Sequence, residues 1–282
     1  MKLKVLPILL TSILFSTSSY AALGEHNVNN DTLTNKHKVH DFKFYASLYE
    51  KKSNKLDRIL QRNQSNPKKI KAISKLFLNS SYVKNRLIGS GVEKERFVAD
   101  FRALDCFTFL DYVESLRKSY DFSYDFSDNL IKTRYKNSKV DFLLRKHFFS
   151  DWTYEDDNGD RNAEDITEYL TEHTNTIQKE LNQKADGGTY IAGLPIVSRK
   201  ISYIPGDSID GSVVNNLENG DYIGIYTNIA GLDVTHTGIF IRGKNGPVYR
   251  NASSLSNNMK VVDTPFLEYV QGKPGIVVYR AL

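Results

Sequence analysis

The stretch that decides the fold is residues 102–116, which read RALDCFTFLDYVESL. Apolar side chains recur in it at three- and four-residue spacing, and this pattern predicts an amphipathic helix. Asp105 stands where an N-cap residue is expected, so the helix should begin directly after it. Cys106 is the only cysteine in the 282 residues. The sequence therefore predicts that Cys106 lies in the first turn of a helix, on its buried side. The residues at helical spacing are Cys106, Phe109 or Leu110, Val113 and Leu116.

The beginning of the chain predicts export. Residues 1–21 contain two early lysines, an apolar segment and small residues at their end, the pattern of a cleaved secretory signal peptide. The apolar segment is shorter than the roughly 20 residues of a membrane-spanning helix. We therefore expect a signal peptide over 1–21, a flexible polar leader over 22–40 and no stable membrane insertion after cleavage. The expected location is periplasmic or secreted.

The remainder of the chain changes from helical to strand-rich patterns. Several segments before residue 185 mix charged and apolar residues at helical spacing. After about residue 200, short segments rich in Ile, Val, Tyr and Thr are separated by Gly, Asn and Pro, which is typical of an antiparallel sheet. We expect an α+β protein with one domain over 41–282 and a helical insertion around 120–185. The helix candidates are 42–62, 67–78, 93–101, 128–149 and 163–183, and the strand candidates are 221–228, 234–243, 246–253 and 275–282.

A single cysteine is unusual in an exported chain. Secreted proteins usually pair their cysteines, and one left over indicates intermolecular pairing or a reactive thiol. A helix N-terminus stabilises a thiolate through its free N–H groups, so the sequence predicts a lowered pKa for the Cys106 thiol. The alternative is that Cys106 is a small buried hydrophobic residue.

His236 is the histidine best placed to act with this thiol. It lies within the strand-like segment DVTHTGIFI, and the next residue on its face is Gly238, which leaves room beside the imidazole. A thiol and an imidazole together suit nucleophilic catalysis, in which histidine takes the proton of cysteine. The alternative is a core histidine with satisfied hydrogen bonds. Of the others, His26, His37 and His40 lie in the polar leader, and His173 is expected on an exposed helix face.

A third polar residue should orient the imidazole. Asn251 falls near the end of the following strand segment, where its carboxamide oxygen could accept the second imidazole proton. Asp233 is the rival, but it lies close to His236 on the same strand and is expected to point at the turn. Asn251 is therefore the better candidate. A second alternative is a serine hydrolase that uses Ser253 or Ser254 with His236. This alternative is disfavoured because no G-x-S-x-G turn surrounds either serine.

Charge and ligand spacing exclude other classes of function. The net charge of +5 is mild and is not concentrated in one run, so nucleic-acid binding is not supported, whereas weak attraction to an anionic polymer is. No histidines are paired at metal-binding spacing, and the acidic stretch 156–160 does not match a calcium loop. We expect no metal and no other cofactor.

Four motifs resemble those of the N-acetylmuramoyl-L-alanine amidase-like family of exported bacterial proteins, a branch of the NlpC-type, papain-like cell-wall peptidases. In order, they are LDCFTFLDYVE, RKHFFSDW, THTGIFI and YRNASS, and the resemblance extends over about residues 75–280. It implies a papain-like fold in which a helical N-terminal half, with the nucleophile at a helix N-terminus, packs on an antiparallel sheet from the C-terminal half. The implied nucleophile is Cys106, the base His236 and the third residue Asn251, where relatives often have histidine.

The resemblance also implies a substrate and further contacts. The substrate would be peptidoglycan or its muropeptides, cleaved as by an N-acetylmuramoyl-L-alanine amidase or a γ-D-glutamyl-diaminopimelate endopeptidase. Tyr82 matches a tyrosine of the active site in relatives, and Asp105 could hold a substrate ammonium in addition to capping the helix. Asp151 and Trp152 are candidate substrate contacts, and the alternative is ordinary core packing of Phe148, Phe149 and Trp152. A non-catalytic wall-binding module is the alternative to an enzyme.

Overall fold

The computed structural model describes residues 43–45 and 47–282. The predicted signal peptide and leader lie outside these residues. The described part contains both helices and strands throughout its length. The helices are α1 Ser47–Leu60, α2 Asn66–Leu76, α3 Cys106–Lys118, α4 Phe122–Arg134, α5 Gly211–Asn216 and α6 Phe266–Val270. The strands are β1 Lys43–Tyr45, β2 Ser81–Tyr82, β3 Val98–Asp100, β4 Ala103–Leu104, β5 Ala163–Asp165, β6 Asn175–Leu181, β7 Val197–Pro205, β8 Tyr222–Tyr226, β9 Val234–Gly243, β10 Gly246–Ser253, β11 Lys260–Pro265 and β12 Gly275–Ala281.

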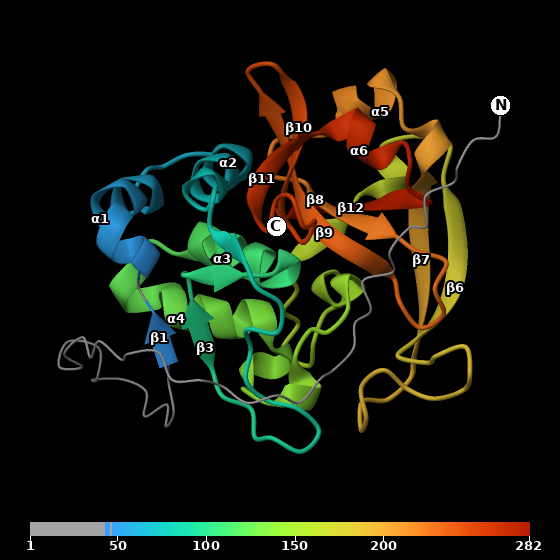
Figure 1. The fold of residues 1–282 in the computed structure, drawn as a ribbon, viewed down its shortest axis with the longest axis horizontal. Coiled ribbons are helices and arrows are strands. Elements are labelled where there is room, and N and C mark those ends of the chain that lie inside the picture. The colour runs from blue at the N-terminus through green and yellow to red at the C-terminus, as the bar shows by residue number, and fades with distance from the viewer. Residues whose placement is uncertain (1–42, 46) are drawn as a thin grey trace. The chain divides into compact units, whose positions relative to one another are not determined.

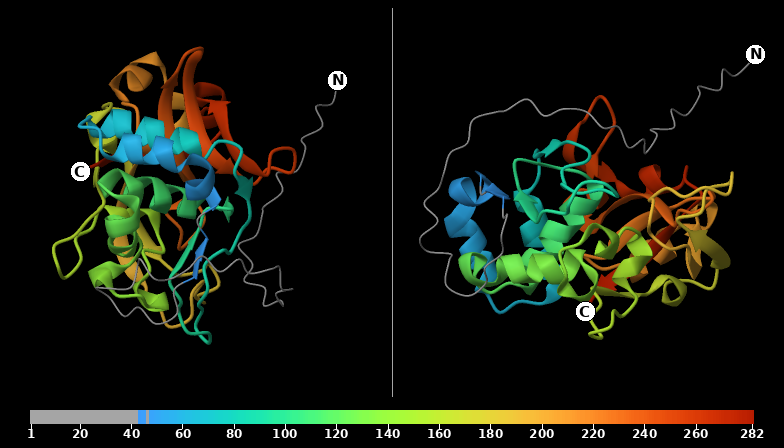
Figure 2. Two further views of the ribbon diagram at one scale, coloured as in Figure 1. Left: turned by 90° about the vertical axis from the view of Figure 1, so that its left-hand side faces the viewer. Right: turned by 90° about the horizontal axis from the view of Figure 1, so that it is seen from below.

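One large curled sheet organises the described residues (Figure 1). Its strand order is β4-β2-β11-β10-β9-β8-β12-β7-β6, and β5 pairs with β12 outside this path. Neighbouring strands are antiparallel except β2 and β4. Helices α1 to α4 lie together beside the sheet, as the further views in Figure 2 also show. The predicted α+β class is therefore confirmed.

Strand β9 contributes to two separate apolar cores because its side chains alternate between faces. Ile239 and Ile241 join the core that contains the apolar residues of α3. Phe240 points to the other face and joins the core that contains residues of α5 and α6. Helix α3 and helix α6 thus cover opposite faces of the same strand.

Several predicted elements differ from the observed ones. The segments 93–101 and 163–183 contain no α-helix and instead include β3, β5 and β6, so these two helix predictions are wrong. Strand β6 pairs with β7 over its whole length, from Asn175–Tyr203 to Leu181–Val197. Such long-range pairing overrides a weak local preference. The predicted helical insertion around 120–185 is only partly helical. It contains the α-helix α4, followed by short 3-10 helices and the strands β5 and β6.

Strands β9 and β10 diverge next to the start of α3. Their pairing runs from Gly243–Gly246 to Ile239–Arg250 and ends there, while β10 continues along β11. The Thr237 hydroxyl, beyond the last pair, donates a hydrogen bond of 3.1 Å to the Cys106 carbonyl oxygen. The first turn of α3 therefore lies at the fork between these strands.

Among residues 43–45 and 47–282, no helix combines the length and the apolar character that crossing a bilayer needs.

Candidate active site

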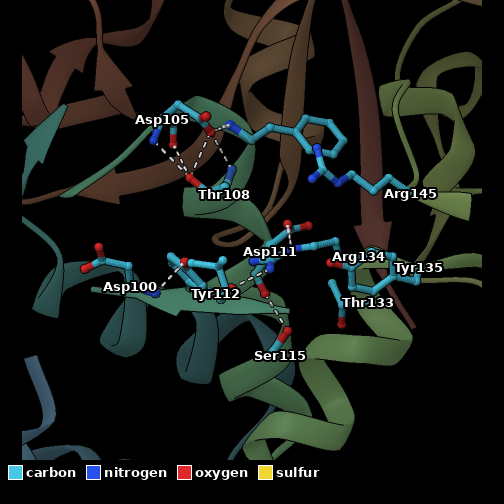
Figure 3. A network of polar contacts seen from close by, with 12 residues as sticks. Asp100, Asp105, Thr108, Asp111, Tyr112, Ser115, Thr133, Arg134, Tyr135 and Arg145 are labelled. Atoms are coloured by element: carbon cyan, nitrogen blue, oxygen red, sulfur yellow. Dashed lines mark hydrogen bonds and ion pairs between the residues drawn. The ribbon is translucent and has the colours of Figure 1, made fainter. Parts of the chain in front are cut away.

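Helix α3 begins with a complete capping box. The Asp105 carboxylate accepts hydrogen bonds from the Phe107 N–H (3.1 Å) and the Thr108 N–H (2.8 Å), and the Thr108 hydroxyl accepts one from the Asp105 N–H (2.9 Å) (Figure 3). These bonds satisfy N–H groups that have no partner within the helix. They make Cys106 the first residue of α3, as the sequence predicts.

Buried polar contacts hold α3 against its neighbours. Arg134 of α4 forms an ion pair of 2.8 Å with Asp111 (Figure 3). It also donates a 2.6 Å hydrogen bond to the Val98 carbonyl oxygen. The Tyr112 hydroxyl accepts a hydrogen bond from the Asp100 N–H. These contacts tie α3 to α4 and to β3, and so they fix the orientation of α3 and of its first turn, although Oδ1 of Asp111 and one guanidinium nitrogen of Arg134 are buried without a partner.

The Cys106 thiol has a raised pKa, and the residue as a whole is half-buried. Burial raises its pKa to about 11, with a further contribution from the Asp105 carboxylate, while hydrogen bonds from the Thr237 backbone and hydroxyl act in the opposite direction. The expectation of a lowered pKa is therefore wrong, because burial and the Asp105 charge together outweigh the hydrogen bonds that act in the opposite direction.

The imidazole of His236 is oriented by Asn251. The Asn251 side-chain nitrogen donates to the Tyr249 carbonyl oxygen at 3.1 Å, so its amide oxygen faces the imidazole. This oxygen lies 3.0 Å from Nε2 of His236, and it can only accept, so Nε2 carries the proton. The neutral ring then has its lone pair on Nδ1. Burial lowers the pKa of His236, as does the charge of Lys273, whereas the bond to Asn251 raises it.

Cys106 and His236 share the same neighbours. The rings of Tyr249 and Tyr269 lie 6.0 and 6.5 Å from the imidazole, measured between ring centroids. Burial raises the pKa of both phenols, that of Tyr269 to about 12, and the thiolate that Cys106 forms at high pH contributes to each shift. The Asp105 charge acts on Cys106 and on His236. The structure thus brings the cysteine and the histidine into one region.

The space predicted beside His236 is filled by an aromatic ring. A Cβ at Gly238 would lie 2.6 Å from the Tyr249 ring and 2.7 Å from the Arg250 carbonyl oxygen. Glycine is therefore required here so that the ring can lie against the strand. No local pattern in the sequence marks Tyr249 as part of the site, although its position two residues before Asn251 places both on one face of β10.

Tyr82 also lies near the thiol. It belongs to β2, and burial raises its pKa to about 12, with smaller contributions from the charges of Cys106 and Asp105. A hydrogen bond with Ser254 opposes this shift. The phenol is therefore protonated at neutral pH and is available as a hydrogen-bond donor.

Asp151 and Trp152 are buried, which favours the packing alternative over substrate contact. Asp151 forms ion pairs with Arg199 (2.9 Å) and Lys136 (3.1 Å). Trp152 has 0% of its surface exposed and packs edge-on against Phe107, with ring centroids 6.0 Å apart. Because Phe107 lies in the first turn of α3, this contact helps to hold that turn in place.

The remaining polar residues considered from the sequence, Asp233, Ser253 and His173, are bonded elsewhere or lie in other positions than expected. Asp233 accepts hydrogen bonds from the N–H groups of Ser150 (2.7 Å) and Val234 (2.8 Å). Ser253 is buried and accepts a hydrogen bond from Asn258. His173 is exposed in the loop before β6 rather than on a helix. The described residues contain no group of three or more His, Cys, Asp or Glu side chains that could hold a metal ion.

The fold and the site define a class: an α+β protein with a cysteine at the start of a helix and a histidine–asparagine pair on the adjoining strands. Residues 72–276 match the family described as N-acetylmuramoyl-L-alanine amidase-like (AmiA-like), which is more than half of the chain. The chain belongs to this family.

Solved structures share the fold. An N-acetylmuramoyl-L-alanine amidase from Bacteroides uniformis ATCC 8492 superposes with a TM-score of 0.64 at 26% identity, over 77% of this chain and 98% of that one. A protein of Legionella pneumophila from the family DUF1460 superposes with a TM-score of 0.66 at 21% identity, over 84% of this chain and 96% of that one. The second likeness shows the fold alone. A search of curated proteins found no match.

Proposed function

We propose that this protein is an exported cysteine hydrolase that cleaves amide bonds in peptidoglycan peptides, with a papain-like arrangement of Cys106, His236 and Asn251. The observation that carries the proposal is the 3.0 Å contact between Nε2 of His236 and the amide oxygen of Asn251, at the fork where α3 begins. This contact leaves Nδ1 as the basic atom. Membership of the amidase-like family and likeness to a structure named as an amidase support the substrate class.

The chemistry proceeds from two neutral groups. As the sulfur of Cys106 attacks the amide carbonyl carbon, Nδ1 of His236 takes the thiol proton, and the carbonyl oxygen becomes an oxyanion. The imidazolium then gives its proton to the leaving amine as the C–N bond breaks. Water, deprotonated by His236, attacks the thioester and releases the acid and the thiol. Because burial raises the thiol pKa and lowers the imidazole pKa, this proton moves with substrate bound rather than beforehand.

Two donors suit the oxyanion. The Cys106 N–H lies at the start of α3, where helical N–H groups have no partner within the helix. The Tyr82 hydroxyl keeps its proton because its pKa is about 12. Both capping hydrogen bonds to Asp105 end on Oδ1, so Oδ2 is the atom that we assign to a substrate ammonium.

Two peptidoglycan bonds fit this chemistry, the N-acetylmuramoyl–L-alanine amide and the γ-D-glutamyl–diaminopimelate amide. The name of the similar structure favours the first. An exported enzyme would meet either bond in the periplasm or outside the cell.

Digestion of defined muropeptides tests the proposal. Purified disaccharide-tetrapeptides are incubated with wild-type protein and with Cys106→Ala, and the products are identified by mass. We expect wild type to release free peptide and disaccharide, or a shortened muropeptide, and Cys106→Ala to release nothing. Intact muropeptides in both samples, together with retention of both proteins on isolated sacculi, would show a wall-binding module instead.

A further inference from the structure

Thr237 joins the two candidate catalytic residues. It follows His236 in β9 and has 1% of its surface exposed. Its hydroxyl donates a 3.1 Å hydrogen bond to the Cys106 carbonyl oxygen, so one dipeptide of β9 carries the imidazole and also contacts the first turn of α3.

The backbone N–H of Thr237 also points to the side of Cys106. The Phe240 N–H donates to the Asp221 carbonyl oxygen, on the β8 side of the strand. Because N–H directions alternate along a strand, the N–H groups of Ile239 and Thr237 point to the β10 side. Pairing with β10 ends at Ile239–Arg250. Beyond this point the N–H of Thr237 faces Cys106 instead of β10. A hydrogen bond from this N–H contributes to lowering the pKa of the thiol.

The two donors act differently in the two states of the thiol. A hydroxyl carries one proton and rotates to suit its acceptor. While the thiol is neutral, the Thr237 hydroxyl bonds the Cys106 carbonyl oxygen. A negative charge on the sulfur would favour a turn of the hydroxyl toward it, and both the hydroxyl and the backbone N–H of Thr237 act to lower the thiol pKa.

We propose that Thr237 is a positioning residue that holds the first turn of α3 on β9 and supplies two hydrogen-bond donors to the Cys106 thiolate formed during the reaction. Its importance for turnover rests on the proposed function. Its effect on the thiol does not, because that effect is measured without a substrate.

Alkylation of Cys106 by iodoacetamide tests the proposal with three variants. Thr237→Val keeps the branched shape and removes the hydroxyl, Thr237→Ser keeps the hydroxyl, and Thr235→Val makes the same change at an exposed position on the same face. We expect Thr237→Val to slow alkylation about threefold to tenfold between about pH 7 and pH 10, as a shift of about one pKa unit requires. Thr237→Ser and Thr235→Val should follow wild type.

The outcomes separate a chemical role from a structural one. A valine variant that alkylates at the wild-type rate at every pH overturns the proposal. If thermal melting shows that Thr237→Val does not fold, Thr237→Ala is measured in its place, with the same expected shift. If muropeptides are cleaved by none of the proteins while the alkylation shift and the serine rescue persist, the proposed function fails and the role of Thr237 toward the thiol is supported.

Discussion

The pH dependence of Cys106 alkylation tests how the site is activated. Burial and the Asp105 charge raise the thiol pKa to about 11, so about 0.1% of the protein carries a thiolate at pH 8. An exposed cysteine, with a pKa of about 8.5, is about one quarter thiolate at this pH. The ratio of thiolate populations is about 250. A more basic thiolate is also a better nucleophile, which offsets about tenfold of this difference. We expect Cys106 to react about 20-fold more slowly than an exposed cysteine in a reference peptide.

Intact mass measured against time gives the rate directly, because Cys106 is the only cysteine. The rate should rise about tenfold per pH unit from about pH 6 to pH 10, without a plateau. Asp105→Asn is the matched variant, since asparagine is as good an N-cap as aspartate but carries no charge. It should react faster than wild type, because the Asp105 charge raises the thiol pKa. A rate that is constant from about pH 5 to pH 8 and exceeds that of the reference peptide would mean that a thiolate–imidazolium pair exists at rest, and would refute this account.

Three further changes have defined outcomes. Asn251→Ala removes the acceptor that holds the His236 N–H. We expect kcat in muropeptide cleavage to fall about tenfold or more, because the loss of one orienting hydrogen bond costs about 1.4 kcal/mol. Asn251→His should retain measurable activity. An unchanged kcat for Asn251→Ala would exclude an orienting role. The Lys273 charge lowers the His236 pKa, so Lys273→Gln should raise it and move the acid limb of the kcat/KM profile to higher pH, whereas a shift to lower pH would contradict the sign. Trp152→Ala should lower the free energy of unfolding by about 3–5 kcal/mol in urea denaturation, because the ring is fully buried. Trp152→Phe should leave KM unchanged. A large rise in KM for Trp152→Phe would instead support a substrate contact by Trp152.

Local signals in the sequence were sufficient for several elements. The start of α3 could be predicted because an N-cap side chain bonds N–H groups only two and three residues away. The strands β8, β9, β10 and β12 could be predicted because their alternating side chains face two cores, and both cores select apolar residues. The preference for Asn251 over Asp233 followed from position along the chain, because Asp233 lies close to His236 on the same strand whereas Asn251 lies on the next strand segment.

Other features depended on contacts between distant residues. Strand β6 has a polar sequence, NTIQKEL, and becomes a strand through pairing with β7, which lies about twenty residues further along the chain. The environments of Asp151 and Trp152 likewise depend on partners from separate segments, Arg199 and Phe107. No pattern within HFFSDW indicates whether its side chains face a substrate or the core.

By itself, the sequence determined which groups are available for chemistry: one thiol, at a helix start set by its own neighbours, and one histidine within a strand. The tertiary structure decided the protonation of these groups and the partners that orient them. A pKa depends on how much water surrounds a group and on the charges near it, and both are set by residues that folding brings from β2, β9, β10 and α6. For this reason the helix N-terminus, visible in the sequence, predicted a lowered pKa for the thiol, whereas the packing around it raises this pKa.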